Sequence, residues 1–381
     1  MRRIGCWITV LVLVLGLLSP AVTAAPAEVA AKSAVLMDAT TGTVLYEQNS
    51  HEALPPASVT KVMTMLLIME AIDSGKLSWE DSVTASEAAA AKGGSQIYLK
   101  VGETMTVSDM VKSIAVSSAN DCACAMAEHL AGSEAAFVEQ MNKRAQELGM
   151  ENTHFVNCTG LDDEPEAASH KTSAADIAIM SRELLTKHPD IKNYTTIWMD
   201  TVRGGTFGLS NTNKLVRFYS GATGLKTGFT TSAGYCLSAS AMRDGMELIA
   251  VVMGSETSPA RFAACKSLLD YGFANFALVA PEAETGQVAV KLGVDGTVRA
   301  VPKENPRLLI DKSQRDSVHT TLELKEEIEA PVSRGQRLGT LTVKAGEQVL
   351  QQIPLVAETS VPKLSFGQLY VRILKRLCMA K

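Results

Sequence analysis

The sequence predicts an α+β protein: an antiparallel sheet sandwiched by helices, followed by a small all-β domain and a C-terminal amphipathic helix. Strand-like runs stand near both ends of residues 25–275, and helical patterns fill the space between them. Over residues 277–360 the pattern changes to short alternating runs. A chain of 381 residues is long enough for two such domains.

The composition is that of a globular protein. Apolar residues make up 46% of the chain and charged residues 20%, which excludes disordered, collagen-like and coiled-coil classes. The net charge of −5 argues against a nucleic-acid-binding surface, so we expect no nucleic-acid partner. Only the N-terminus carries a long apolar run, which excludes a protein with several membrane spans.

The N-terminus has the pattern of a secretory signal peptide, residues 1–24. Two arginines precede an uncharged run from Ile4 to Leu18, and Val22 and Ala24 place the cut after Ala24. The alternative is an uncleaved anchor, but the apolar run is short for a span of ~20 residues. Cleavage removes two arginines and no acidic residue, which leaves a net charge of −7.

The first domain, residues 25–275, begins with a predicted hairpin of strands 33–38 and 43–46. Helical patterns follow at 58–74, 107–117, 121–131, 134–148 and 173–187. Two further strands, 235–241 and 246–253, flank an Asp-Gly turn. A last amphipathic helix at 259–271 closes the domain.

The second domain, residues 277–360, is predicted to be all-β. Its short runs are separated by Gly, Pro, Asn and Asp; they lie at 288–290, 298–301, 308–310, 338–343 and 349–350.

The tail, residues 361–381, is predicted to contain an amphipathic helix that associates with a membrane. Residues 364–381 contain no carboxylate but several cations: Arg372, Lys375, Arg376 and Lys381. Apolar side chains recur at helical spacing: Phe366, Leu369, Tyr370, Ile373, Leu374 and Leu377. This pattern is typical of a helix lying on an anionic membrane. The alternative is a helix docked on the protein's own core, which we disfavour because residues 361–363 look like a linker.

The cysteines suggest no metal chemistry. The six that follow the leader have neither CxxC nor zinc-ligand spacing. We therefore expect no metal and no cofactor.

Ser58 and Lys61 are the first candidate catalytic pair. They stand three residues apart at the start of a helix that is apolar on nearly every side, so they share one face of a buried helix. Burial lowers the pKa of a lysine, and a neutral Lys61 can accept the proton of Ser58. The helix N-terminus favours an oxyanion at that serine. The alternative is a helix-capping serine with a lysine that reaches solvent.

Ser118, Ala119 and Asn120 lie between two helical patterns, where a loop presents a hydroxyl beside a carboxamide. Ser118 is a candidate proton relay, and Asn120 a candidate ligand for a substrate amide. Simple helix termination is the alternative.

Lys226, Thr227 and Gly228 lie on a predicted edge strand, residues 222–229. There the lysine offers a cation and the threonine a hydroxyl, while the glycine leaves room for a ligand backbone. A similar Lys-Thr-Ser run at 171–173 is excluded, because Ser173 has the pattern of a helix N-cap.

The three motifs occur in the order S-x-x-K, S-x-N, K-T-G, a set found in penicillin-binding proteins and class A β-lactamases. With them, the chain resembles the D-alanyl-D-alanine carboxypeptidases, the low-molecular-mass penicillin-binding proteins of peptidase family S11. It is most similar to those of Gram-positive spore-forming bacteria. The resemblance extends over essentially the whole chain, through residues 93–99, 170–178, 211–215, 261–262 and 268–273. It implies a penicillin-binding-protein/β-lactamase-like fold.

The resemblance also implies roles. Ser58 corresponds to the acylated nucleophile and Lys61 to its general base, with Ser118 and Lys226 as proton-relay and electrostatic partners. Substrate contacts are implied at Ser95, Asn120, Thr227, Gly228, Phe229 and Arg261. Among these, Arg261 corresponds to an arginine associated with the terminal carboxylate, and the backbone N–H groups of Ser58 and Phe229 to the oxyanion hole. Phe229 stands where some relatives have histidine.

Three other functions are considered. A class A-like β-lactamase needs a deacylating glutamate in an S-D-N background, but Ala119 replaces that aspartate. Glu164 and Glu166 lie in an acidic stretch that we interpret as a solvated loop. A D,D-endopeptidase acting on cross-links and a non-catalytic penicillin-binding sensor are the remaining alternatives.

The sequence therefore predicts a secreted serine carboxypeptidase that removes the terminal D-alanine of peptidoglycan stem pentapeptides through an acyl-serine. We expect β-lactams to act as covalent inhibitors. The expected location is extracytoplasmic, with peripheral attachment to the outer face of the cytoplasmic membrane through the tail.

Overall fold

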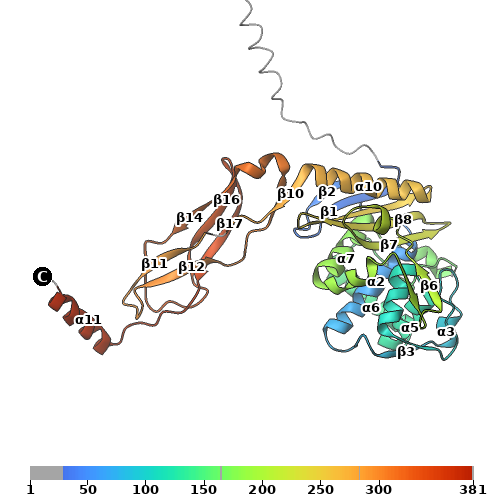
Figure 1. Cartoon of the computed structure of the whole chain (residues 1–381), viewed down its shortest axis with the longest axis horizontal. Helices are drawn as coiled ribbons and strands as arrows, with labels where there is room; N and C mark the ends of the chain where they lie inside the picture. Colours follow the sequence, from blue (N-terminus) through green and yellow to red (C-terminus); the bar gives the residue numbers. More distant parts are fainter. Residues whose placement is uncertain (1–28, 164, 283, 380–381) are drawn as a thin grey trace, which may run out of the picture.

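A five-stranded antiparallel sheet organises the chain up to Asn275 (Figure 1). The structure is a computed structural model that describes residues 29–163, 165–282 and 284–379, so the predicted signal peptide lies outside the described residues. The strand order is β2-β1-β9-β8-β7. The strands are β1 (Ser33–Asp38), β2 (Val44–Gln48), β7 (Ala222–Thr230), β8 (Gly234–Arg243) and β9 (Met246–Ser255). The predicted α+β architecture is confirmed.

Both faces of the central strands are buried, which explains why these strands are nearly continuous apolar runs. In β1, Val35 and Met37 pack into the larger core, whereas Ala34 and Leu36 pack into the core on the opposite face. This alternation follows from the two-residue period of a strand.

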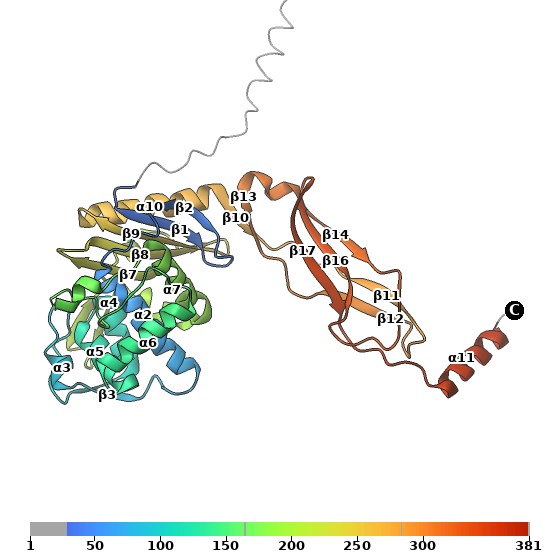
Figure 2. The same ribbon diagram turned by 180° about the vertical axis from the view of Figure 1, so that it is seen from behind.

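Helices cover the two faces of the sheet. Helix α10 (Ser258–Asn275) packs on one face, and α7 (Ala174–Lys187) packs on the other, together with α2, α4, α5 and α6 (Figures 1 and 2). Helix α2 (Lys61–Asp73) lies buried within that second layer. Ser173 caps α7 by accepting a hydrogen bond from the Asp176 N–H, as predicted.

Shorter elements complete the first domain. The other helices are α3 (Glu87–Ala90), α4 (Val107–Ser117), α5 (Asn120–Ala131), α6 (Glu134–Glu147), α8 (Lys192–Thr195) and α9 (Leu215–Phe218). The 3-10 turns are η2 (Ala57–Thr60), η3 (Pro165–Ser169) and η4 (Pro189–Ile191). Two small ladders pair β3 (Ser82–Thr84) with β4 (Thr104–Thr106), and β5 (Met199–Val202) with β6 (Phe207–Ser210).

The second part of the chain is all-β, as predicted. A two-stranded ladder of β10 (Phe276–Val279) and β13 (Leu308–Asp311) follows α10 directly, and η5 (Lys312–Ser317) comes after it. A six-stranded sheet then has the order β14-β16-β17-β12-β11-β15. Its strands are β11 (Gly286–Lys291), β12 (Thr297–Pro302), β14 (Val318–Leu324), β15 (Glu327–Glu329), β16 (Arg337–Ala345) and β17 (Gln348–Ala357).

The tail forms helix α11 (Phe366–Met379), which extends from the end of the β domain that is distant from the first domain (Figures 1 and 2). Phe366 is 87% exposed and Leu377 69% exposed, so a helix docked on the protein's own core is excluded. None of the helices in the described ranges is long and apolar enough to cross a membrane.

The linker interpretation of residues 361–363 is wrong. Val361 is buried and exchanges backbone hydrogen bonds with Val332, and Lys363 forms a β-bridge with Gly293. The segment belongs to the β domain because an apolar residue at 361 fills its core.

Candidate active site

Ser58 and Lys61 lie side by side where η2 runs into α2. Ser58 is half-buried within η2, and Lys61 is the first residue of α2. The distance from Lys61 Nζ to Ser58 Oγ is 3.0 Å. The prediction that the two side chains share one helical face is confirmed.

Lys61 is completely buried. Burial lowers the pKa of its amine to about 7, although the negative charge of Asp121 acts in the opposite direction. A substantial fraction of Lys61 is therefore neutral near neutral pH. The sequence predicted this depression from the apolar surroundings alone.

Three oxygen atoms surround Lys61 Nζ. Besides Ser58 Oγ, these are Asn120 Oδ1 and the Thr159 carbonyl oxygen, the latter at 2.8 Å. A neutral amine has two N–H groups and one lone pair, and the amide and backbone oxygens can only accept hydrogen bonds. The two N–H groups therefore go to Asn120 and Thr159, and the lone pair faces the Ser58 hydroxyl. Sequence reasoning missed Thr159, because no side-chain motif marks a backbone carbonyl.

Asn120 differs from its predicted role. Its Oδ1 accepts from Lys61, and its Nδ2 donates to the Gly93 carbonyl at 2.7 Å. Both ends of the carboxamide are thus used inside the protein. The structure adds a role in orienting Lys61, and the contact of Asn120 with a substrate amide remains a prediction.

Ser118 ends α4 in the left-handed region, at φ 63°. Its Oγ is buried and has no hydrogen-bond partner among the described residues. An unpaired buried hydroxyl is costly, which is consistent with a group that takes its partner from a bound ligand. This placement agrees with the predicted proton relay.

Lys226 and Thr227 lie on β7, which is the edge strand of the five-stranded sheet. Lys226 is buried, and its Nζ donates to the Thr227 carbonyl at 2.8 Å. Burial, reinforced by the charges of Lys61 and Arg261, lowers the pKa of Lys226 well below its usual value. The sequence predicted that Lys226 offers a cation, and its burial means that the charged form is disfavoured until an anion binds.

Gly228 brings the edge strand β7 close to η2, which contains Ser58 and is called the nucleophile turn. A Cβ at this position would lie 2.7 Å from the Pro56 carbonyl oxygen and 3.0 Å from the Val59 nitrogen. The protein's own η2 turn therefore fills the space on the Cβ side of Gly228, and room for a ligand backbone along the strand edge remains a prediction.

Arg261 lies under β7 and β8 rather than in open solvent. Its Nη1 donates to the Gly228 carbonyl at 2.8 Å and to the Cys236 carbonyl at 3.3 Å, while Nε has no partner among the described residues. Burial lowers the pKa of Arg261 from its usual value. Its predicted contact with a substrate carboxylate remains a prediction.

Phe229 is 52% exposed and stacks on Tyr235, with ring centroids 4.3 Å apart. An exposed aromatic directly after the K-T-G motif offers an apolar wall to a ligand at the edge strand.

The loop at residues 93–99 is fixed by a residue that the sequence analysis did not single out. Asp121 accepts hydrogen bonds from the N–H groups of Ile97 and Leu99. The Ser95 side chain is exposed, and its carbonyl accepts from the Asn120 N–H at 2.7 Å. Ser95 is therefore available to a ligand, as predicted.

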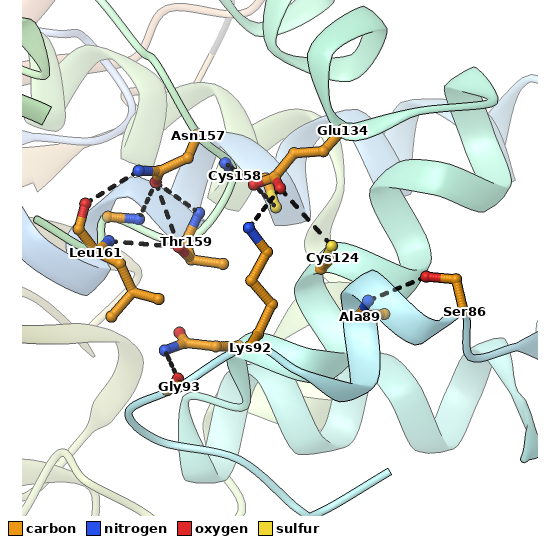
Figure 3. Close-up of polar contacts among 12 residues, drawn as sticks. Ser86, Ala89, Lys92, Gly93, Cys124, Glu134, Asn157, Cys158, Thr159 and Leu161 are labelled. Carbon is orange, nitrogen blue, oxygen red and sulfur yellow. Dashed lines mark hydrogen bonds and ion pairs between the residues drawn. The ribbon is translucent and has the colours of Figure 1, made fainter. Parts of the chain in front are cut away.

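A tight turn at residues 157–161 holds the Thr159 carbonyl (Figure 3). Asn157 Oδ1 accepts from the N–H groups of Thr159 and Gly160, and Asn157 Nδ2 donates to the Leu161 carbonyl. Gly160 has φ +80°, and a Cβ there would lie 1.9 Å from the Ala57 carbonyl oxygen. Only glycine allows this turn to pack on η2.

The acidic stretch proposed for a β-lactamase is not placed as a base. Glu166 is exposed within η3, and Glu164 lies outside the described residues. Within the described ranges, no group of three or more His, Cys, Asp or Glu side chains is placed to hold a metal ion.

Comparison with known proteins agrees with this geometry. The model of the peptidase S11 family, described as D-alanyl-D-alanine carboxypeptidase, matches residues 20–257, and that of the penicillin-binding protein 5 C-terminal domain matches residues 273–363. The D-alanyl-D-alanine carboxypeptidase DacF of Bacillus subtilis is 45% identical over 88% of this chain and 87% of its own length.

Solved structures show the same similarity. Penicillin-binding protein 5 of Haemophilus influenzae superposes with a TM-score of 0.76 at 30% identity, over 89% of this chain and 100% of that chain. Penicillin-binding protein D2 of Listeria monocytogenes in its ampicillin-bound form has a TM-score of 0.57 at 32% identity, over 66% of this chain and 100% of that chain.

We predict that Gly160→Ala lowers the free energy of unfolding by at least about 3 kcal/mol, because it combines a strained φ with overlap of Ala57. Gly75→Ala is the matched control, since Gly75 has φ +74° and nothing within 4 Å of its Cβ position. It should cost only about 1 kcal/mol. Denaturant unfolding of both variants checks this; equal losses would show that the contact with Ala57 does not matter.

Proposed function

This chain belongs to the peptidase S11 family of D-alanyl-D-alanine carboxypeptidases, and we propose that it is a secreted enzyme working through an acyl-serine. The substrate we propose is the peptidoglycan stem pentapeptide ending in D-Ala-D-Ala. The observation that carries the proposal is Lys61, whose amine has a pKa of about 7 and lies 3.0 Å from Ser58 Oγ.

In the proposed acylation step, Lys61 takes the proton of Ser58, and Oγ attacks the carbonyl between the two D-alanines. The backbone N–H groups of Ser58 and Phe229 would stabilise the resulting oxyanion. The leaving amine of D-alanine needs a proton, which the Lys61 ammonium supplies through the Ser118 hydroxyl. Water then hydrolyses the acyl-enzyme and restores Ser58.

The terminal carboxylate of the substrate fits the cationic side of the site. Lys226 and Arg261 are both buried, and burial lowers the pKa of each below its usual value. A bound carboxylate would reverse that effect by favouring the charged forms. We propose that Thr227 and Ser95 contribute further hydrogen bonds to the peptide.

β-Lactams are the proposed covalent inhibitors. Penicillin-binding protein D2 of Listeria monocytogenes has been solved in ampicillin-bound and cefotaxime-bound forms. By similarity, the same compounds would acylate Ser58 of this chain. Hydrolysis of that adduct would be slow, because Ala119 is buried where β-lactamases have aspartate, and Glu166 is exposed.

We further propose that α11 holds the enzyme on the outer face of the cytoplasmic membrane. The helix presents its apolar side chains to solvent, and residues 364–381 contain no acidic residue. Arg372 donates to the carbonyls of Gly293 and Val294, at 3.0 and 2.9 Å, which ties the helix to the β domain. An anionic lipid surface complements both the charge and the apolar face.

Release of D-alanine from diacetyl-Lys-D-Ala-D-Ala tests the function directly. The enzyme should release it, Ser58→Ala should abolish release, and penicillin should leave one adduct, on the Ser58 peptide, in mass spectrometry. Fast penicillin hydrolysis would instead indicate a β-lactamase. An adduct without D-alanine release would indicate an endopeptidase or a silent sensor, which cross-linked peptide would separate.

The acylation rate should depend on pH through Lys61. Only the neutral amine accepts the proton, so the rate should rise with pH and level off above a midpoint near 7. Asp121, Cys158 and Lys226 are the charged or titratable groups around Lys61. Stopped-flow measurement with a fluorescent penicillin checks this; a midpoint near the usual lysine pKa of 10.5 would contradict a buried neutral base.

Deleting residues 364–381 should release the mature protein from vesicles containing phosphatidylglycerol. The same deletion should leave kcat/KM on the soluble peptide unchanged, because α11 lies far from α2, the helix that begins at Lys61 (Figure 1). Vesicles of phosphatidylcholine alone provide the control and should bind the intact protein more weakly. Undiminished binding of the truncated protein in a sedimentation assay would refute the attachment.

A further inference from the structure

Glu134 is the centre of a polar cluster that includes Cys158 of the 157–161 turn (Figure 3). It is the first residue of α6, and its carboxylate accepts from Lys92 Nζ at 2.7 Å. Cys158 reaches the same carboxylate through its backbone N–H at 3.1 Å and its thiol at 3.2 Å. The Cys124 thiol is a fourth, longer contact at 3.7 Å.

The cluster joins a negatively charged carboxylate to an uncharged thiol. Burial alone would raise the pKa of Glu134, but hydrogen bonds from Lys92 and Cys158 lower it below its usual value. Burial, together with the neighbouring Cys124 and Glu134, raises the pKa of the Cys158 thiol well above its usual value. Glu134 is therefore an anion, and the Cys158 thiol is a protonated donor to it.

Cys158 connects this cluster to the general base. Its carbonyl accepts from Thr64 Oγ1 at 2.7 Å, and the next carbonyl, that of Thr159, accepts from Lys61 Nζ at 2.8 Å. Thr64 and Lys61 both belong to α2. The backbone of residues 158–159 is thus held by α2 on one side and by Glu134 on the other.

We propose that Glu134 is a positioning residue for Lys61: by holding Cys158, it sets the Thr159 carbonyl that orients the lysine lone pair toward Ser58. The inference rests on the proposed function of Lys61 as general base. Glu134 lies in none of the three motifs and in none of the stretches that carried the family resemblance.

Loss of the acceptor at 134 has two expected consequences. The N–H and thiol of Cys158 lose their partner, so the Thr159 carbonyl is no longer fixed and the Lys61 lone pair is poorly directed. Water that enters to satisfy Cys158 also relieves the burial of Lys61, so the pKa of Lys61 rises. Acylation should therefore slow, and its pH midpoint should move to higher pH.

Three variants separate positioning from charge and from general stability. Glu134→Met keeps the bulk of the side chain but removes the acceptor. Glu134→Gln keeps one acceptor oxygen and removes the charge, while Lys92 can turn into the cavity of about 230 Å³ that it lines. Glu183→Gln is the control: Glu183 binds Arg144 of the same helix α6 at 2.8 Å, and its side chain is 21% exposed against 19% for Glu134.

The experiment measures single-turnover acylation by a fluorescent penicillin as a function of pH, with the melting temperature of each variant in parallel. Glu134→Met should slow acylation at least about tenfold and shift the midpoint upward. Glu134→Gln should stay within about threefold of wild type, and Glu183→Gln should change neither the rate nor the midpoint. If Glu134→Met does not fold, Glu134→Asp, which withdraws the acceptor by one methylene, should give the same shift.

A wild-type rate and midpoint in a folded Glu134→Met would overturn the inference, whatever its melting temperature. Equal slowing in Glu134→Met and Glu183→Gln would also overturn it, because that outcome reports the stability of α6. Failure of the wild-type enzyme to become acylated would instead refute the proposed function itself. The two failures are therefore distinguishable.

Discussion

The complete burial of the Lys61 amine beside Ser58 is the constraint on which the rest of the first domain depends. An ammonium without an ion-pair partner is unstable in an apolar layer. Burial therefore lowers the pKa of Lys61 to about 7, where the amine can be neutral. A neutral amine is useful only when its lone pair has a fixed direction. Asn120 and the Thr159 carbonyl supply that direction from two separate segments.

Those segments reach Lys61 only because the backbone approaches η2 unusually closely. Gly160 places the 157–161 turn against Ala57, and Gly228 places β7 against Pro56 and Val59. A side chain at either glycine would push its segment away from the nucleophile turn. The geometry of the site therefore depends on main-chain packing as much as on the reactive side chains.

Local patterns predicted a large part of this structure. The periods of the apolar residues predicted the long helices and the five-stranded sheet of the first domain and five strands of the second. The spacing of Ser58 and Lys61 predicted the pair. Both kinds of prediction depend on neighbours within a few residues. The partners of Lys61 lie 59 and 98 residues away, and one of them is a carbonyl that every residue possesses. Asp121 and Glu134 were missed for the same reason, because each accepts hydrogen bonds from backbone N–H groups that are distant in the sequence.

Contacts that the fold makes with itself could not be predicted from the motifs. Asn120 and Gly228 were predicted to meet a ligand, and the structure adds that Asn120 donates to the Gly93 carbonyl and that Gly228 packs against η2. A sequence motif identifies which residues gather at a site without showing which contacts the fold itself consumes. Residues 361–363 were misinterpreted likewise, since Pro and Lys suggested a linker while Val361 paired with Val332.

The distribution of charge in the site fits a substrate that ends in a carboxylate. Burial and the positive charges of Lys61 and Arg261 lower the pKa of Lys226, and in the described part of the chain none of the three forms an ion pair with a carboxylate. The free site therefore disfavours the charged forms of Lys61 and Lys226, at a cost in stability. Binding of an anion offsets that cost. The favourable interaction with the charged form of Lys226 would therefore form only when the terminal carboxylate of the substrate binds. Under the proposed contact, a substrate without a terminal carboxylate would gain nothing from Lys226 and Arg261, so the proposed arrangement would select the end of the peptide chain.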